Sequence, residues 1–200
     1  MKNPQSSHEQ QLRALLNQVQ SGESSVDDAL QALKIAGQTN IAPANLKFAT
    51  VDHDRARRCG FPEVVFCEGK TATDTAAIAI EILSRADRLL LTRASQEHAS
   101  AVQQAVPAAH YHERARCLTI TPKGLPLDDL ANLGHVAVVC AGTSDLPVAA
   151  EAATTLRIAG NRVSQCNDVG VAGLHRLLER IPEIRTANVV GAVAGMEGAL

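Results

Sequence analysis

The sequence predicts an α/β protein in which a parallel sheet is covered by helices on both faces. Strand-like runs at 135–141, 162–166 and 187–194 alternate with helical patterns at 146–159 and 171–180. Strands that alternate with helices in this way are typical of a parallel sheet in an α/β domain. Each run also ends in a turn rich in glycine and polar residues, which is where open α/β sheets bind their ligands.

The C-terminal part, residues 125–200, is expected to form a three-layer α/β/α domain of the flavodoxin-like type. A helix should follow the last strand, yet the sequence ends at Leu200. Three strands and two helices leave one edge and one face of the sheet uncovered. We therefore expect this domain to be incomplete at its C-terminus, lacking about a quarter of a doubly wound fold. Completion of the sheet by a partner is the alternative.

Residues 41–124 are expected to form a small α/β domain. A charged loop is predicted at 52–58, and it is followed by a strand within 60–67 that closes in a glycine turn. Periodicity and capping residues predict the other elements. These are strands at 48–51, 88–92, 109–112 and 117–120, and helices at 73–84 and 95–105.

Residues 1–40 read as a helical appendage. Amphipathic patterns predict helices at 9–19 and 26–35, the second capped by Ser25, while residues 1–7 have a composition typical of disorder. Between the two α/β parts, residues 122–130 contain two prolines and are expected to be a linker.

The composition excludes several classes of function. The net charge of −2, no Trp, one Tyr and three Phe argue against a nucleic-acid surface. No run is long and apolar enough for a membrane span, and the polar N-terminus does not look like a signal peptide. Five scattered cysteines without a CxxC pair predict a cytoplasmic protein without a structural zinc site, with each thiol a small buried residue.

The turn Gly142-Thr143-Ser144-Asp145 between a strand and a helix is the first candidate site. Free backbone N–H groups and the positive end of a helix dipole favour an anionic group there. Ser144 or Asp145 is expected to cap the following helix, and Pro147 suits its first turn.

Four stretches of the sequence together resemble one enzyme family, from about residue 45 onward. They are 52–71, with Glu68-Gly69-Lys70-Thr71 at its end, 142–147, 167–176 (Asn-Asp-Val-Gly-Val-Ala-Gly-Leu-His-Arg) and 194–200 (Ala-Gly-Met-Glu-Gly-Ala-Leu). The family is pyridinium-3,5-biscarboxylic acid mononucleotide synthase, which begins nickel-pincer nucleotide biosynthesis for lactate racemase maturation. The second half also resembles phosphoribosylaminoimidazole carboxylase, with Ser-Asp before a Pro and a second turn that ends in His-Arg.

The resemblance implies carboxylation of nicotinic acid adenine dinucleotide at pyridinium C5 by CO2 or bicarbonate. Hydrolysis of the phosphoanhydride then releases AMP. The family's nucleophilic cysteine lies in an Asn-Ser-Cys-Ala segment beyond the Met-Glu-Gly motif, so none of the five cysteines here is given that role. A 200-residue protein without this segment is expected to be inactive or impaired. The resemblance also implies a homo-octamer.

Three residues are candidates for catalysis. The carboxylated ring carbon must lose its proton to a base, and the resemblance places Glu197 there; binding of turn N–H groups or helix capping is its alternative role. Asp145 caps its helix, contacts ribose hydroxyls or holds Mg²⁺ beside the diphosphate. His175 faces the cleft or is a surface residue.

The remaining candidates bind the substrate. Arg176 is expected to meet phosphate or carboxylate, and Asp168 lies at a ligand-facing turn or forms an Asx turn. Arg55 and Arg58 belong to a basic run that meets the diphosphate or is simply solvated. Lys70 follows a glycine, but the spacing excludes a P-loop for ATP. The full set is Gly142, Thr143, Ser144, Asp168, Arg176, Gly195, Met196, Arg55, Arg58 and Lys70.

Two other functions stay open. The first is a carboxylase or mutase that acts on aminoimidazole ribonucleotide. This hypothesis accounts for the motifs of the second half but assigns no role to residues 1–125. A non-catalytic nucleotide-binding module predicts tight binding of the dinucleotide without turnover.

Overall fold

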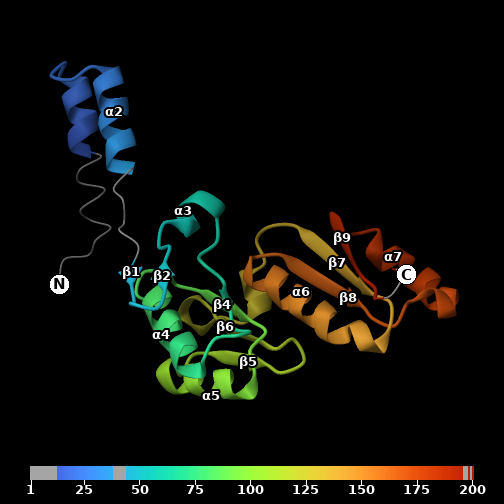
Figure 1. Ribbon diagram of the computed structural model, residues 1–200. Helices are drawn as coiled ribbons and strands as arrows, with labels where there is room; N and C mark the ends of the chain where they lie inside the picture. The colour runs from blue at the N-terminus through green and yellow to red at the C-terminus, as the bar shows by residue number, and fades with distance from the viewer. Residues whose placement is uncertain (1–12, 38–43, 196–197, 199) are drawn as a thin grey trace. The chain divides into compact units, whose positions relative to one another are not determined.

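The computed structural model describes residues 13–37, 44–195, 198 and 200 (Figure 1). The chain divides into two compact units, Met1–Ala42 and Pro43–Leu200. None of the helices within the described ranges combines the length and the apolar character that crossing a membrane requires.

The first unit contains two helical segments, 13–20 and α2 (Val26–Gly37). Ser25 caps α2, because its Oγ accepts the N–H of Asp28 at 3.1 Å and donates to the Asp28 carboxylate at 2.6 Å. The predicted cap and second helix are confirmed. The expected disorder at 1–7 and the start of the first helix lie outside the described residues.

The second unit begins with a four-stranded mixed sheet in the order β3-β4-β6-β5. β3 and β4 are parallel, whereas β6 pairs antiparallel with both β4 and β5. A short antiparallel hairpin, β1-β2, precedes this sheet. The strands are β1 (Ala44–Asn45), β2 (Thr50–Val51), β3 (Val65–Phe66), β4 (Leu89–Thr92), β5 (His110–His112) and β6 (Cys117–Ile120).

Helices α4 (Ala72–Leu83) and α5 (Gln96–Ala105) build the core of this sheet with β4 and β6. Thr71 caps α4 and Ser95 caps α5, each through its side-chain oxygen. The core is aliphatic, and its largest fully buried members are Ile82, Leu89, Leu91, Val102 and Leu118. The helices and the last three strands predicted for this part are confirmed, and the two earlier strands are shorter than expected.

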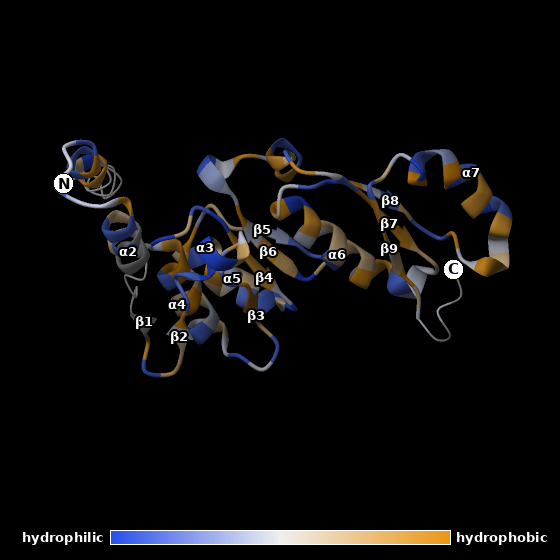
Figure 2. Cartoon of the chain, turned by 90° about the horizontal axis from the view of Figure 1, so that it is seen from above, coloured by the Kyte–Doolittle hydropathy of each residue, from blue (hydrophilic) through white to orange (hydrophobic). Residues whose placement is uncertain are grey.

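The loop expected at 52–58 is wrong in part, because Arg55–Cys59 forms helix α3. Asp54 pairs with Arg57 at 2.8 Å and with Arg58 at 3.3 Å, three and four residues further on. Ion pairs at this spacing stabilise a helical turn. Gly60, with φ +75°, ends the helix in the left-handed conformation. Figure 2 shows α3 as a hydrophilic segment.

The second sheet is parallel, in the order β8-β7-β9, with β7 (His135–Cys140) between β8 (Arg162–Cys166) and β9 (Val189–Val193). Helix α6 (Leu146–Ile158) packs on the face that carries Val138 and Cys140. Leu177 and Ile184 of α7 (Leu174–Ile184) pack on the opposite face, against Val139 and Cys166. The predicted three-layer arrangement around a parallel sheet is confirmed.

The predicted helix at 171–180 is displaced. Residues Val171–Gly173 form a 3-10 turn, and α7 begins at Leu174 and continues past Pro182 to Ile184. Proline usually stops a helix, but burial of Ile184 against the sheet favours its last turn. The predicted linker 122–130 contains two further 3-10 turns, η1 (Pro122–Gly124) and η2 (Leu127–Leu130).

Helix α6 contacts both sheets of the second unit. Ile158 is buried with Leu90 and Cys117 of the first sheet. The Arg93 guanidinium lies 2.8 Å from the Glu151 carboxylate of α6. One helix thus supplies a shared core to the two sheets. The expected domain boundary at 124 stays a prediction.

Candidate functional site

Three loops meet at the carboxyl edge of the parallel sheet. The Ala141 N–H donates to the Val193 carbonyl at 3.0 Å, which joins the ends of β7 and β9. The Gly170 N–H donates to the Ala141 carbonyl at 3.0 Å, which joins the loop after β8 to the end of β7. The sequence predicted this convergence, because the carboxyl ends of parallel strands share one edge.

Gly170 makes the contact between two of these loops possible. A Cβ on this residue would lie 2.8 Å from the Ala141 carbonyl oxygen, closer than backbone atoms allow. Asp168, two residues earlier, has φ +58°, a left-handed conformation that Asp tolerates better than most residues. The loop after β8 therefore depends on these two residue types.

Asp145 faces the loop after β9. Its Oδ2 accepts the Gly142 N–H at 3.2 Å, and its Oδ1 lies 3.0 Å from the position of a Cβ on Gly195. Gly142, Thr143, Ser144 and Gly195 form the rest of this corner, in which Thr143 and Ser144 are exposed.

Asp145 occupies the expected N-cap position of α6, but the expected side-chain capping bond is not formed. Neither side chain bonds an N–H of α6. Thr143–Asp145 forms a 3-10 turn in which Asp145 has helical dihedral angles, so its carboxylate reaches back to Gly142. Pro147 does lie in the first turn of α6. The exposed N–H groups of Thr143 and Ser144 stand at the start of the helical segment, where such groups lack intrahelical acceptors.

Arg176 forms an ion pair with Asp168, so two of the predicted binding residues bind each other. The guanidinium lies over Gly173, where an added Cβ would collide with its Nε. Both side chains stay partly exposed, at 38% for Arg176 and 50% for Asp168. His175 is exposed on α7 and makes no hydrogen bond to the described residues.

Cys140 lies beneath the turn. Its Sγ donates to the Gly142 carbonyl at 3.3 Å. Burial, followed by the nearby Asp145 carboxylate, raises the pKa of this thiol. The protonated thiol is therefore favoured, and Cys140 does not have the properties of an activated nucleophile.

The described donor set does not make a resident Mg²⁺ site. It contains no group of three His, Cys, Asp or Glu side chains that would hold a metal ion. One Asp145 oxygen accepts a backbone N–H and Asp168 is paired with Arg176, whereas Mg²⁺ requires near-octahedral oxygen ligands.

The basic run of the N-terminal signature is mostly paired. Arg58 bonds the Asp52 carboxylate and Arg57 bonds that of Asp54. The hydrogen bond from Arg57 contributes most to a lowered pKa of Asp54. Arg55 is exposed and has no ion-pair partner within the described ranges, so it alone of the three is free for an anion.

Lys70 closes the turn after β3. Its Nζ donates to the Phe66 carbonyl at 2.7 Å, and its own carbonyl lies 2.9 Å from His98 Nε2. It also lines a cavity of about 180 Å³ with Glu63 and Phe66. No contact between described residues links Lys70 with Arg55 or Arg58, so the structure does not gather these three into one site.

Met196 and Glu197 lie outside the described residues, and their roles stay predictions. Gly195 and Gly198 flank them, with the Gly198 N–H donating to the Gly195 carbonyl at 2.9 Å. Sequence reasoning did not find a second cavity, beside His110 and His112. The sequence pattern that could have indicated this cavity is His-Tyr-His within a predicted strand. Residues two apart on a strand point to the same face, so His110 and His112 lie side by side.

The fold and this edge define an α/β protein in which the loops at the carboxyl ends of the parallel strands form a candidate ligand site. Residues 43–123 match the family model "LarB/PurE-like N-terminal domain". An uncharacterized protein of Methanocaldococcus jannaschii, MJ0165, is 32% identical over 196 residues, which cover 94% of this chain and 74% of that protein. The chain belongs to the LarB family, a carboxylase/mutase-type family.

Proposed function

We propose that this protein carboxylates nicotinic acid adenine dinucleotide at pyridinium C5, using CO2 or bicarbonate, and hydrolyses the phosphoanhydride to release AMP. The product would be pyridinium-3,5-biscarboxylic acid mononucleotide, the precursor of the nickel-pincer nucleotide. The observation that carries the proposal is the meeting of three loops at the carboxyl edge of the parallel sheet, in a chain of the LarB family.

The edge offers groups suited to a dinucleotide. The exposed turn at Thr143 and Ser144 presents N–H groups at a helix start, which suits a phosphate. Arg176 is partly exposed and can exchange its bond to Asp168 for a bidentate bond to phosphate or carboxylate. Asp145 accepts hydrogen bonds and suits a ribose hydroxyl.

The ring chemistry requires a nucleophile and a base. A pyridinium ring is electron-poor, so a nucleophile must first add to it and leave an enamine. C5 then forms a bond to CO2, and a base removes the C5 proton. Expulsion of the nucleophile restores the aromatic ring. We assign the base to Glu197, on the resemblance alone, and the nucleophile to none of the five cysteines.

The test is product analysis by mass spectrometry. The protein is incubated with nicotinic acid adenine dinucleotide and ¹³C-bicarbonate, with and without Mg²⁺. We expect AMP together with a pyridinium mononucleotide that carries one ¹³C carboxylate from a form extended by the family's Asn-Ser-Cys-Ala segment, which supplies the nucleophile, and little or none from the 200 residues alone. Asp145→Asn and Glu197→Gln should each lower the rate at least about tenfold. Asp87→Asn, a change at an exposed carboxylate of the first sheet, is the matched control.

Two outcomes would decide against the proposal. Carboxylation of aminoimidazole ribonucleotide, with no product from the dinucleotide, would favour the purine-pathway reaction. Tight binding of the dinucleotide without turnover would favour a nucleotide-binding module. We also propose a homo-oligomer, an octamer by resemblance, which light scattering on the purified protein would test.

A further inference from the structure

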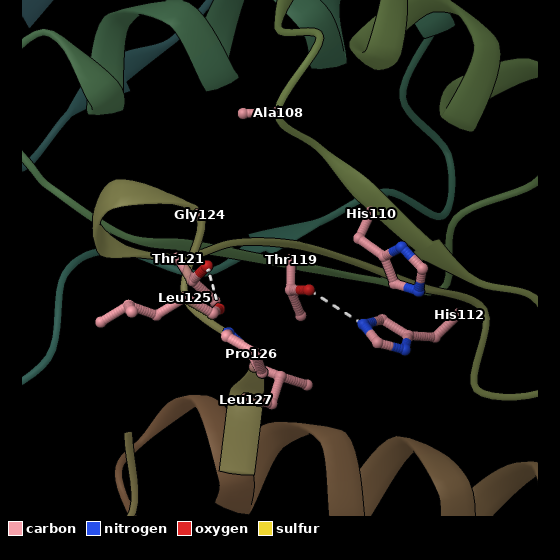
Figure 3. A pocket seen from close by; sticks show the side chains of 9 residues that line it. All are labelled: Ala108, His110, His112, Thr119, Thr121, Gly124, Leu125, Pro126 and Leu127. Carbon is pink, nitrogen blue, oxygen red and sulfur yellow. Dashed lines mark hydrogen bonds between the residues drawn. The ribbon is translucent and has the colours of Figure 1, made fainter. Parts of the chain in front are cut away.

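A cavity of about 320 Å³ lies beside the first sheet (Figure 3). β5 and β6 form one side of it with His110, His112 and Thr119. The segment across η1 and the start of η2 forms the other side with Leu125, Pro126 and Leu127. None of these residues belongs to the three loops at the edge of the parallel sheet.

The two histidines present an edge-to-face pair of rings to the cavity. They are two residues apart on β5, their ring centroids are 4.5 Å apart, and their planes make an angle of 72°. His112 Nε2 lies 2.9 Å from Thr119 Oγ1 on the neighbouring strand. This hydrogen bond orients the His112 ring and uses one of its two nitrogens, which leaves Nδ1 for another partner.

The opposite wall is apolar and held in place. The Thr121 hydroxyl donates to the Leu125 carbonyl at 2.6 Å, which fixes the turn that carries Leu125 and Pro126 (Figure 3). The cavity therefore has two imidazoles on one side and a proline ring with two leucine side chains on the other. This arrangement suits a flat ring more than a branched or spherical ligand.

The polar side chains of the described cavity lining are two histidines and two threonines. Among the described residues that line it, none is Asp, Glu, Lys or Arg. Burial, then His110 and Arg157, lowers the pKa of His112 to about 4, so its ring is neutral. A charged ligand would lose hydration here and find no carboxylate, ammonium or guanidinium partner among the described lining residues. A neutral imidazole and a hydroxyl instead offer both a donor and an acceptor.

We propose that this cavity binds an uncharged planar nitrogen heterocycle, of the size of one nucleobase or of nicotinamide. The volume lies at the lower end of the range for small-molecule sites, which is too small for a dinucleotide. The ring packs between the imidazoles and Pro126, and its polar edge pairs with His112 and Thr119. The proposal does not depend on the reaction proposed above.

Nuclear magnetic resonance titration of the intact protein tests this proposal. The probes are nicotinamide, adenine and uracil, with nicotinate as the anionic match to nicotinamide. We expect shifts of the His110 and His112 ring signals, with a dissociation constant of about 1 mM or below for at least one neutral probe. Nicotinate should bind at least about tenfold more weakly than nicotinamide.

Two variants locate the binding. Leu127→Trp should abolish it by filling the cavity, and the isosteric Thr119→Val should weaken it about fivefold by freeing the His112 ring. Asp87→Asn, at an exposed carboxylate outside the cavity lining, should leave it unchanged. Equal affinity in all three variants, equal binding of nicotinate, or no shift with any neutral probe would overturn the proposal. So would saturation of the two histidines by Zn²⁺ alone.

Discussion

The two sheets of the Pro43–Leu200 unit bury their central strands equally well but differ at their periphery. In the first sheet, Leu89, Leu90 and Leu91 of β4 are at most 1% exposed, and the edge strand β3 buries Val65 (3% exposed) on one face while it exposes Phe66 (51%) on the other. In the second sheet, β7 is buried throughout, yet Val189 and Val190 of β9 are 59% and 50% exposed.

The two sheets also differ in what fixes the loops around them. The first sheet gains its stability from side chains that touch other side chains. The second sheet adds loops whose geometry depends on backbone contacts, such as that between Gly170 and Ala141. Both sheets have side-chain cores, but the loops at the carboxyl edge of the second sheet are also joined by backbone hydrogen bonds.

Core truncation should show the largest contrast between the two regions. Leu91→Ala removes a fully buried side chain from β4 and should lower the free energy of unfolding by about 2–5 kcal/mol. Leu178→Ala, at a residue of α7 that is 56% exposed, should cost less than about 0.5 kcal/mol. Urea denaturation measures both. Equal losses would mean that the exposed face of α7 is covered in solution.

The glycine contact should show the next largest effect. Gly170→Ala places a methyl group 2.8 Å from a backbone oxygen and should cost about 1–3 kcal/mol. Gly191→Ala in β9 is the control, because nothing lies within 4 Å of its added Cβ. We expect that variant to be neutral or slightly more stable. If both glycines tolerate alanine alike, the loop after β8 is not fixed by the contact with Ala141.

Much of this fold was predictable because local signals agree with packing. Thr71 and Ser95 lie directly before their helices and cap them, and the alternation after residue 135 gave the parallel sheet. The errors fall where local signals compete. The ion pairs of Asp54 with two arginines stabilise helix α3 where a charged loop was expected. Packing of Ile184 against the sheet stabilises the last turn of α7, beyond Pro182.

The sequence predicted the position of the candidate site in the fold but not the contacts of its side chains. Sequence pattern puts Asp145, Asp168 and Gly195 at one edge, but it does not show which side chains bind each other. The pairing of Arg176 with Asp168, and of Asp145 with the Gly142 N–H, depends on loop geometry. The cavity at His110 and His112 needs the turn at 124–127 to close it, a tertiary contact without a local pattern.

The half-buried His112 of the first sheet gives a pH-dependent contrast between the two regions. Because the pKa of His112 falls from 6.5 to about 4 on folding, the unfolded chain binds more protons between these values. His112 should therefore lower stability as the pH falls from about 6.5 to 4, by no more than about 2 kcal/mol after solvent screening. Urea midpoints of the wild type and His112→Phe should converge or cross in this window. His175→Asn, in the second region, should keep the wild-type profile, and a flat difference between wild type and His112→Phe would contradict the prediction.

The smallest expected difference in stability is between substitutions at the starts of helices α4 and α6. Thr71 accepts the Asp74 N–H at 3.0 Å, so Thr71→Ala should cost about 1 kcal/mol. Ser144 precedes α6 but makes no capping bond, so Ser144→Ala should change stability by less than about 0.3 kcal/mol. Thermal and urea unfolding of the two variants compare them directly. Because the Ser144 hydroxyl can add a hydrogen bond to the phosphate that the N–H groups of this turn are proposed to hold, added dinucleotide should stabilise Ser144→Ala less than it stabilises Thr71→Ala. Equal stabilisation of both variants would remove the Ser144 side chain from the binding site.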